Sequence, residues 1–180
     1  MQYIVAYKRR KAILKRLTPL GPTSPSNWQI PYVDHSTGDR WIDEAITGTH
    51  GPGIRCLTKL PEPKPDQILE IALNSDFEDE AIVASFKLSN TPKIFPRLLD
   101  NAERLIKHED KLLARRAGLV IQWAATLETT NYNPIVGKSI SEINSDWEAV
   151  LTISKRAKTL VKQASNVLGE TIEKDWSQLQ

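Results

Sequence analysis

Apolar residues recur every three or four positions through most of the chain after residue 65, which is the spacing of amphipathic helices. Ser75-x-x-Glu78 and Ser145-x-x-Glu148 match the capping-box pattern, in which serine and glutamate close the first turn of a helix. Gly169 marks the end of the last and longest stretch. The predicted helices cover 66–74, 75–88, 91–106, 109–127 and 145–168, with Pro96 able to delay the start of the third.

Residues 28–60 follow a different pattern, because their apolar positions alternate as in β-strands. Strands are predicted at 28–32, 40–46 and 54–60, with a turn at 35–39 in which Gly38 can adopt the left-handed conformation. Pro31 lacks a backbone N–H, which predicts that the first strand lies at the edge of the sheet. These residues therefore predict a small antiparallel β-meander.

The N-terminal residues fit two descriptions. Tyr3–Tyr7 could form a strand, whereas the Lys, Arg, Ala and Leu content of Tyr7–Leu17 favours a helix, which is our prediction for this segment. Two proline-rich stretches, 18–27 and 61–65, then divide the chain into a basic segment and linker (1–27), the β-meander (28–60) and a helical section (61–180). We expect the last two to form one compact unit.

The fold class predicted by this order of elements is α+β. It consists of a small antiparallel β-meander followed by a helical bundle or a short array of helical hairpins. With 180 residues, 40% of them hydrophobic, the chain is long enough to bury a core without disulfides. The one cysteine, Cys56, fits a reducing compartment, and no secretory signal or membrane span is apparent, so we expect a cytoplasmic protein.

The net charge of +2 conceals an uneven distribution. Residues 1–20 hold six basic side chains and no acidic one, whereas residues 62–80 hold seven acidic side chains and one basic one. A basic arm attracts polyanions, and an acidic body attracts basic partners. The acidic side chains of the second segment are Glu62, Asp66, Glu70, Asp76, Glu78, Asp79 and Glu80.

The residues that catalysis would require do not form a recognisable pattern. The glycine-rich stretch 48–53 lacks the Gly-Lys-Ser/Thr sequence of a phosphate-binding loop, and Pro52 removes a backbone N–H that a phosphate would need. The three histidines are scattered, Cys56 occupies a strand position typical of a buried thiol, and the acids 78–80 suit the positive end of a helix dipole. We therefore predict a protein that is not an enzyme and uses no cofactor or metal.

Three kinds of binding remain open. The acidic segment favours a basic protein partner, and the helical hairpins would also suit a scaffold or adaptor that binds through an apolar groove. The basic run Lys8–Arg16 could bind nucleic acid, but few aromatic residues accompany it, so we rank nucleic acid as an unlikely partner. Membrane binding ranks lower still, because the apolar side of that run is narrow. Trp28 and Trp41 could belong to the core or anchor an interface.

Residues 28–55 contain a spaced series of aromatic, acidic, threonine, glycine and proline residues. After Trp28 come Tyr32-x-Asp34-x-x-Thr37-Gly38-x-x-Trp41 and then Gly51-Pro52-Gly53-Ile54-Arg55. This series resembles the small immunity proteins of bacterial polymorphic toxin systems, in particular the family named immunity protein twenty-seven. The resemblance implies a bacterial cytoplasmic protein that binds a cognate toxin domain and blocks it without catalysis.

Many toxin domains cleave nucleic acid and are basic, so an acidic surface could occupy their active sites in place of the phosphate backbone. The candidate partner-binding residues are the acids of the segment 62–80, two acids of the second strand and one tryptophan. They are Trp41, Asp43, Glu44, Glu62, Asp66, Glu70, Asp76, Glu78, Asp79 and Glu80. The other explanation for these acids is an ordinary solvated surface.

Overall fold

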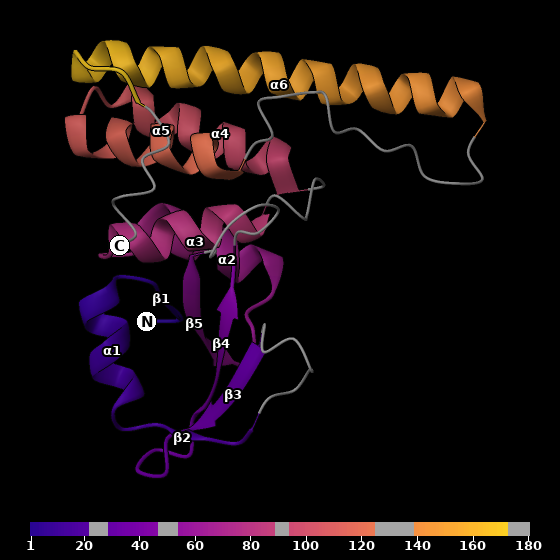
Figure 1. Cartoon of the computed structure of the whole chain (residues 1–180). Helices are drawn as coiled ribbons and strands as arrows, with labels where there is room; N and C mark the ends of the chain where they lie inside the picture. Colours follow the sequence, from indigo (N-terminus) through magenta and orange to yellow (C-terminus); the bar gives the residue numbers. More distant parts are fainter. Residues whose placement is uncertain (22–28, 47–53, 89–93, 125–138, 173–180) are drawn as a thin grey trace. The chain divides into compact units, whose positions relative to one another are not determined.

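A computed structural model describes residues 1–21, 29–46, 54–88, 94–124 and 139–172. Within them the chain has an α+β fold with a five-stranded antiparallel sheet and six helices, which confirms the predicted class (Figure 1). The chain divides into two compact units, one formed by Met1–Ala84 with Asp175–Gln180 and the other by Ser85–Lys174. The division falls inside a helix, α3, and each unit is described below by itself.

The sheet of the first unit is built around a β-meander that the alternating pattern predicts. Its strands are β3 (Gln29–Val33), β4 (Arg40–Ala45) and β5 (Arg55–Leu60), each antiparallel to the next. The turn between β3 and β4 is closed by the N–H groups of Thr37 and Gly38, which donate to the carbonyl of Asp34. Gly38 adopts a φ of 77°, so the glycine performs the predicted left-handed turn.

Two short strands extend this meander on either side. The strand β1 (Tyr3–Ile4) pairs with β5, and β2 (Thr18–Pro19) pairs with β3, so the sheet order is β1-β5-β4-β3-β2. The prediction that β3 is an edge strand is therefore wrong. Pro31 is tolerated beside β2 because it contributes its carbonyl oxygen, which accepts a hydrogen bond from the N–H of Leu20 at 2.9 Å.

The N-terminal segment contains both of the structures that its sequence allows. After β1 comes the helix α1 (Tyr7–Leu14), which lies beside the sheet (Figure 1). Its partly buried Ile13 and Leu14 pack on a small core formed by the buried side chains Ile4, Leu17, Trp41 and Leu57. The prediction of a helix is correct, and the strand that the sequence also allowed at Tyr3–Tyr7 forms over two of these residues.

Two helices complete the described part of the first unit. They are α2 (Pro65–Asn74) and the first half of α3 (Glu78–Leu88). Pro65 stands in the first turn of α2, where its missing N–H costs nothing. The Ser75 hydroxyl accepts from the N–H of Phe77 at 3.1 Å and donates to the carboxylate of Glu80 at 2.6 Å, which connects the end of α2 to the first turn of α3.

The second unit contains a bundle of α4 (Phe95–Lys107), α5 (Lys111–Ala124) and α6 (Ile140–Leu168), each packed against the other two. Alanines at the contacts allow close packing, and the core includes Ala102, Ala117, Ala157, Leu160 and Ala164. This bundle agrees with the predicted helical section. Residues 91–93 and 125–127 of the predicted helices lie outside the described residues.

Several helix ends differ from their predictions for local reasons. The longest helix begins at Ile140 and not near Ser145, because Ser139 and Glu142 form the capping box one and a half turns earlier. The helix α5 begins at Lys111 and not at Glu109, because Asp110 accepts the N–H groups of Leu112 and Leu113. At its far end α6 stops as predicted at Gly169, which has a φ of 75°.

Candidate protein-binding surface

The ten candidate residues separate by burial into surface residues and core residues. Glu62, Asp66, Glu70 and Asp76 are exposed, and Glu44 and Glu78 are half-buried. Trp41, Asp43, Asp79 and Glu80 are each between 3% and 7% exposed. The segment 62–80 is therefore not one continuous acidic surface, and each group needs its own account.

Asp79 and Glu80 lie in the first turn of α3 and hold the N-terminus of the described chain. Glu80 accepts hydrogen bonds from the backbone N–H of Tyr3 at 3.1 Å and from that of Gln2. Asp79 accepts from the N–H of Ala6 at 3.0 Å and forms an ion pair with Arg9. These carboxylates satisfy donors that would otherwise be buried unpaired, so their role is structural.

Asp43 is the centre of a second internal ion-pair cluster. Its two carboxylate oxygens accept from Arg10 Nε at 3.0 Å and from Arg10 Nη2 at 2.6 Å, which is a bidentate contact. Arg55 Nε donates to the same carboxylate at 3.0 Å, and Arg55 Nη2 donates to the Asp43 carbonyl at 2.9 Å. A carboxylate enclosed by two guanidinium groups of its own unit is not presented to a partner.

Asp34 completes the set of buried acids that pair with the basic N-terminal segment. It is 2% exposed, and Arg16 Nε lies 3.2 Å from its carboxylate. The pKa of Asp34 is held below its ordinary value, chiefly by the Ser36 hydroxyl, which donates to the carboxylate, with further help from the Arg16 charge. Burial opposes this shift by disfavouring the charged form.

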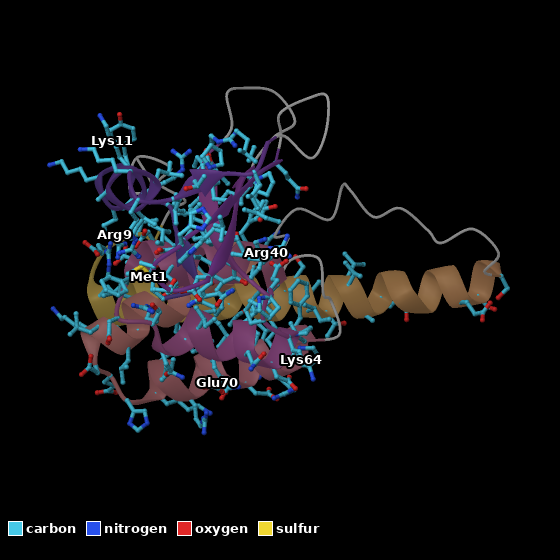
Figure 2. All side chains as sticks on the ribbon, turned by 90° about the horizontal axis from the view of Figure 1, so that it is seen from below. Met1, Arg9, Lys11, Arg40, Lys64 and Glu70 are labelled. Carbon is cyan, nitrogen blue, oxygen red and sulfur yellow. The ribbon has the colours of Figure 1, made fainter. Side chains whose placement is uncertain are left out.

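The six basic residues of the N-terminal segment thus divide by residue type. Arg9, Arg10 and Arg16 pair with Asp79, Asp43 and Asp34, respectively. The lysines of this segment are exposed and are Lys8, Lys11 and Lys15. Figure 2 shows Arg9 and Lys11 extending from opposite sides of α1. Sequence reasoning missed these three arginine partners, and the only signal for them was that arginine suits bidentate carboxylate contacts better than lysine.

Trp41 belongs to the core and not to an exposed interface. It is 5% exposed and packs with Ile4 and Leu57 on the side of the sheet next to α1. Lys59 lies over its ring at 5.9 Å. Trp28, the other candidate anchor, lies outside the described residues, as does the glycine-rich stretch 48–53.

Glu44 and Cys56 lie on the opposite side of the sheet. Glu44 accepts from the Thr58 hydroxyl at 3.1 Å and from the Gln29 amide at 3.0 Å, so its carboxylate is engaged within the sheet. The Cys56 thiol is fully buried, as expected, and its Sγ lies 3.6 Å from Thr58 Oγ1. Tyr3 lies on the same side of the sheet, opposite Thr58. Burial and the surrounding carboxylates raise the pKa of Tyr3 well above its ordinary range.

The exposed acids form what we call the acidic surface, defined as Glu62, Asp66, Glu70 and Asp76. Asp66 and Glu70 are four residues apart on α2, so they occupy one face of the helix. Glu62 lies in the segment that leads into α2, and Asp76 lies in the segment that follows it. The Glu70 carboxylate accepts from the Asn74 amide at 2.8 Å.

An open cavity of about 550 Å³ lies beside Glu70. Its lining includes Met1, Lys59, Asn74 and Glu80. Figure 2 shows Glu70 and Lys11 on opposite sides of the first unit, whereas the exposed Lys64 lies on the same side as Glu70. The acidic surface could therefore contact a partner without interference from the exposed lysines of α1.

The described residues were also compared with the requirements of a metal site and of a membrane-spanning helix. No group of three or more histidine, cysteine or carboxylate side chains is placed to hold a metal ion in that part of the chain. The helices there are all too short or too polar to span a membrane. Comparisons with protein-family models, with curated protein sequences and with solved structures found no match. The functional argument accordingly rests on the surfaces themselves.

Proposed function

We propose that this protein is a non-enzymatic binding module whose acidic surface recognises a basic protein partner. In its most concrete form it is an immunity protein that binds and neutralises a cognate bacterial toxin domain in the cytoplasm. One molecule of the module would occupy one partner, and no cofactor would take part.

The observation that carries this proposal is the grouping of the four exposed acids of the first unit on and beside one helix, α2. Residues 1–84 hold ten basic and eleven acidic side chains, a net charge of −1. Three of the basic side chains are arginines paired with buried aspartates, whereas the acidic surface extends into solvent. Exposed charge of one sign steers an oppositely charged partner and accelerates association.

The resemblance to immunity proteins supports the proposal through the residues that form the β3–β4 hairpin. Tyr32 and Trp41 lie directly opposite each other in β3 and β4, and Asp34 and Gly38 close the turn between them. The matched residues therefore specify a stable hairpin and its core contacts. The choice of a basic toxin as partner rests on the acidic surface, whose residues lie outside the matched stretch.

The nucleic-acid alternative for the N-terminal segment loses support from the ion pairs. Arg9, Arg10 and Arg16 are each bound to an acid of the same unit, so using them to contact phosphates would disrupt internal contacts. The exposed basic side chains of the segment that form no ion pair with a described acid of the same unit are its lysines. The adaptor alternative predicts binding through an apolar groove, which salt would affect little.

Affinity capture with matched variants tests the proposed function. The full tagged chain, its E70K/D76K variant and an E109K/E148K control would each be incubated with lysate of the source organism. The control reverses two exposed acids of the second unit. We expect one basic protein to be enriched in stoichiometric amount by the wild type and the control, and to be lost with E70K/D76K.

A growth assay then separates an immunity protein from other binding modules. Co-expression of the chain should restore growth of cells that express the captured protein, and E70K/D76K should restore it poorly. Equal capture by all three forms would contradict the role of the acidic surface. Capture without any protection would contradict the immunity function.

A further inference from the structure

The outer side of α6 in the second unit carries positive charge that no acidic residue of the same stretch offsets. Residues 149–169 contain Lys155, Arg156, Lys158 and Lys162 and no aspartate or glutamate. The whole unit, 85–174, holds 14 basic and 10 acidic side chains, a net charge of +4. The net charge of residues 149–169, which is also +4, therefore equals the net charge of the whole unit.

Arg156 differs from the three lysines beside it. Its guanidinium contacts the carboxylates of Asp100 and Glu103, both at 2.7 Å, so it helps to fasten α6 to α4. The hydrogen bonds that Arg156 donates to Glu103 and to Asp100, in that order of effect, raise the pKa of Arg156. Lys155, Lys158 and Lys162 are exposed, and no ion pair to them occurs among the described residues.

The three lysines are spaced so that they form one stripe. Separations of three and four residues place them on the same side of the helix, over about 10 Å of its length. Gln163 and Asn166 are exposed beside the stripe and offer amide N–H donors. The opposite side of α6 packs into the bundle through Ala157, Leu160 and Ala164, so the stripe faces outward.

We propose that this stripe binds the phosphate backbone of a nucleic acid, without reading its sequence. Lysines and side-chain amides are donors that proteins use for phosphate oxygens. The exposed side chains of 148–169 include no aromatic or large aliphatic residue, and they are Glu148, Ala149, Thr152, Lys155, Lys158, Thr159, Lys162, Gln163 and Asn166. Protein interfaces are enriched in aromatic anchors and membrane-binding helices have an apolar side, so these exposed residues favour a polyanion with a regular array of phosphates.

This inference is independent of the proposed function, because it concerns another unit and the opposite charge. It also differs from the nucleic-acid alternative that the sequence suggested, which relied on the N-terminal segment. The N-terminal basic run is conspicuous in the sequence, whereas the α6 residues become a stripe only when the burial of the helix is known.

The N-terminal segment provides a matched control. Lys8, Lys11 and Lys15 have the same three-and-four spacing as Lys155, Lys158 and Lys162, and all six are exposed. The variants K155Q/K158Q/K162Q and K8Q/K11Q/K15Q therefore remove the same charge in the same pattern from different units. Glutamine forms helices well, and circular dichroism would verify that both variants are folded.

The experiment measures binding of fluorescein-labelled duplex DNA and single-stranded RNA by fluorescence anisotropy, over a range of salt concentrations. For the wild type on duplex DNA we expect log K to fall against log salt with a slope of about −2.7, as three phosphate contacts predict. K155Q/K158Q/K162Q should bring that slope close to zero, each lysine accounting for about one unit. K8Q/K11Q/K15Q should leave the slope unchanged.

Three results would overturn the inference. The first is no binding by the wild type at low salt, and the second is an equal loss in both triple variants, which would show that only net charge matters. The third is displacement of the nucleic acid by polyglutamate at equal charge concentration, which would identify an acidic protein as the better ligand.

Discussion

Arginine and lysine in the N-terminal segment differ in what they contact, and the difference follows from their chemistry. A guanidinium is planar and donates two parallel hydrogen bonds to a carboxylate, as Arg10 does to Asp43. An ammonium is a compact, strongly hydrated charge, and the lysines of the segment lie in solvent. A run of basic residues can thus be half structural and half exposed.

The same division among acids predicts opposite results for two neighbouring aspartates. Asp79 is 7% exposed and pairs with Arg9, whereas Asp76 is exposed. We expect D79N to lower the free energy of unfolding by about 2 kcal/mol, because it leaves the Arg9 charge without its partner. D76N should change it by less than about 0.5 kcal/mol. Urea unfolding of both variants measures these free energies, and an equal loss of stability in D79N and D76N would contradict a structural role for Asp79 alone.

Tyr3 gives a prediction for alkaline pH. Burial, together with the charges of Glu62, Glu44 and Glu80, raises its pKa far above the ordinary value near 10. An ultraviolet titration should therefore show Tyr3 still protonated in the native protein at a pH where the same residue has ionised in the urea-unfolded chain. Because only the unfolded chain then releases the Tyr3 proton, native stability should fall as the pH rises above about 10.

Y3F supplies the control for that titration. The variant should show the same native titration as the wild type, since the Tyr3 hydroxyl does not contribute to it. Its loss of stability at alkaline pH should be shallower. A native titration in which Y3F has one tyrosine fewer than the wild type would contradict the buried position of Tyr3.

At the scale of elements, the sequence predicts the helices and strands that are long enough for their apolar residues to show a regular spacing, and it does not predict the shorter ones. The strands β3, β4 and β5 and the helices α2 to α6 follow from alternating and helical spacing of apolar residues. The strands β1 and β2 have two residues each, so they carry no period and depend on partners up to 55 residues away. Helix starts were ambiguous where two serines both precede a glutamate at the capping distance.

The candidate surface was predictable to a smaller extent than the fold. The exposed acids of α2 follow from its amphipathic pattern, in which Ile68, Leu69 and Ala72 face inward. The burial of Asp79 and Glu80 could not be read locally, because they bind residues more than 70 positions away. Two carboxylates in the first turn of a helix look alike whether they face solvent or another segment.

Two serine substitutions test whether Ser139, and not Ser145, caps the N-terminus of α6. Ser139 accepts the N–H of Glu142, and the Glu142 carboxylate accepts the N–H of Ser139 in return. We expect S139A to destabilise the first turns of α6 by about 1 kcal/mol. S145A should not, because Ser145 lies inside the helix and alanine favours helices. Faster hydrogen exchange at the start of α6 in S145A than in S139A would contradict this.

The end of α6 is fastened by a contact that only glycine permits. A Cβ atom on Gly118 of α5 would lie 2.1 Å from Ile172 Cδ1 and 3.2 Å from Ala164 Cβ. We expect G118A to lower the free energy of unfolding by about 1 kcal/mol, the cost of crowding less the gain in helix propensity.

The crowding explanation is tested by a double-mutant cycle. In an I172A background, which removes the side chain that the new methyl group meets, G118A should become neutral or stabilising. Thermal unfolding of the four proteins gives the coupling energy. If G118A has the same cost in both backgrounds, Ile172 is not the source of the cost.

At the scale of the whole molecule, each unit presents a charged surface of its own, acidic around α2 and basic along α6. The first presents the acidic surface around α2, with its arginines engaged inside the unit, and the second presents the lysine stripe of α6. A protein with this distribution can engage a basic partner and a polyanion through different surfaces. The net charge of +2 indicates neither capacity, because it sums over both units.

The central claim is that the acidic surface drives recognition of a basic partner, and it is tested most directly by the association rate with the captured protein. Stopped-flow mixing at low and high salt would compare the wild type, E70K/D76K and the E109K/E148K control. The account predicts a fast, salt-sensitive association for the wild type and the control, and a rate at least about tenfold lower at low salt for E70K/D76K. Equal rates for all three proteins, unaffected by salt, would contradict it.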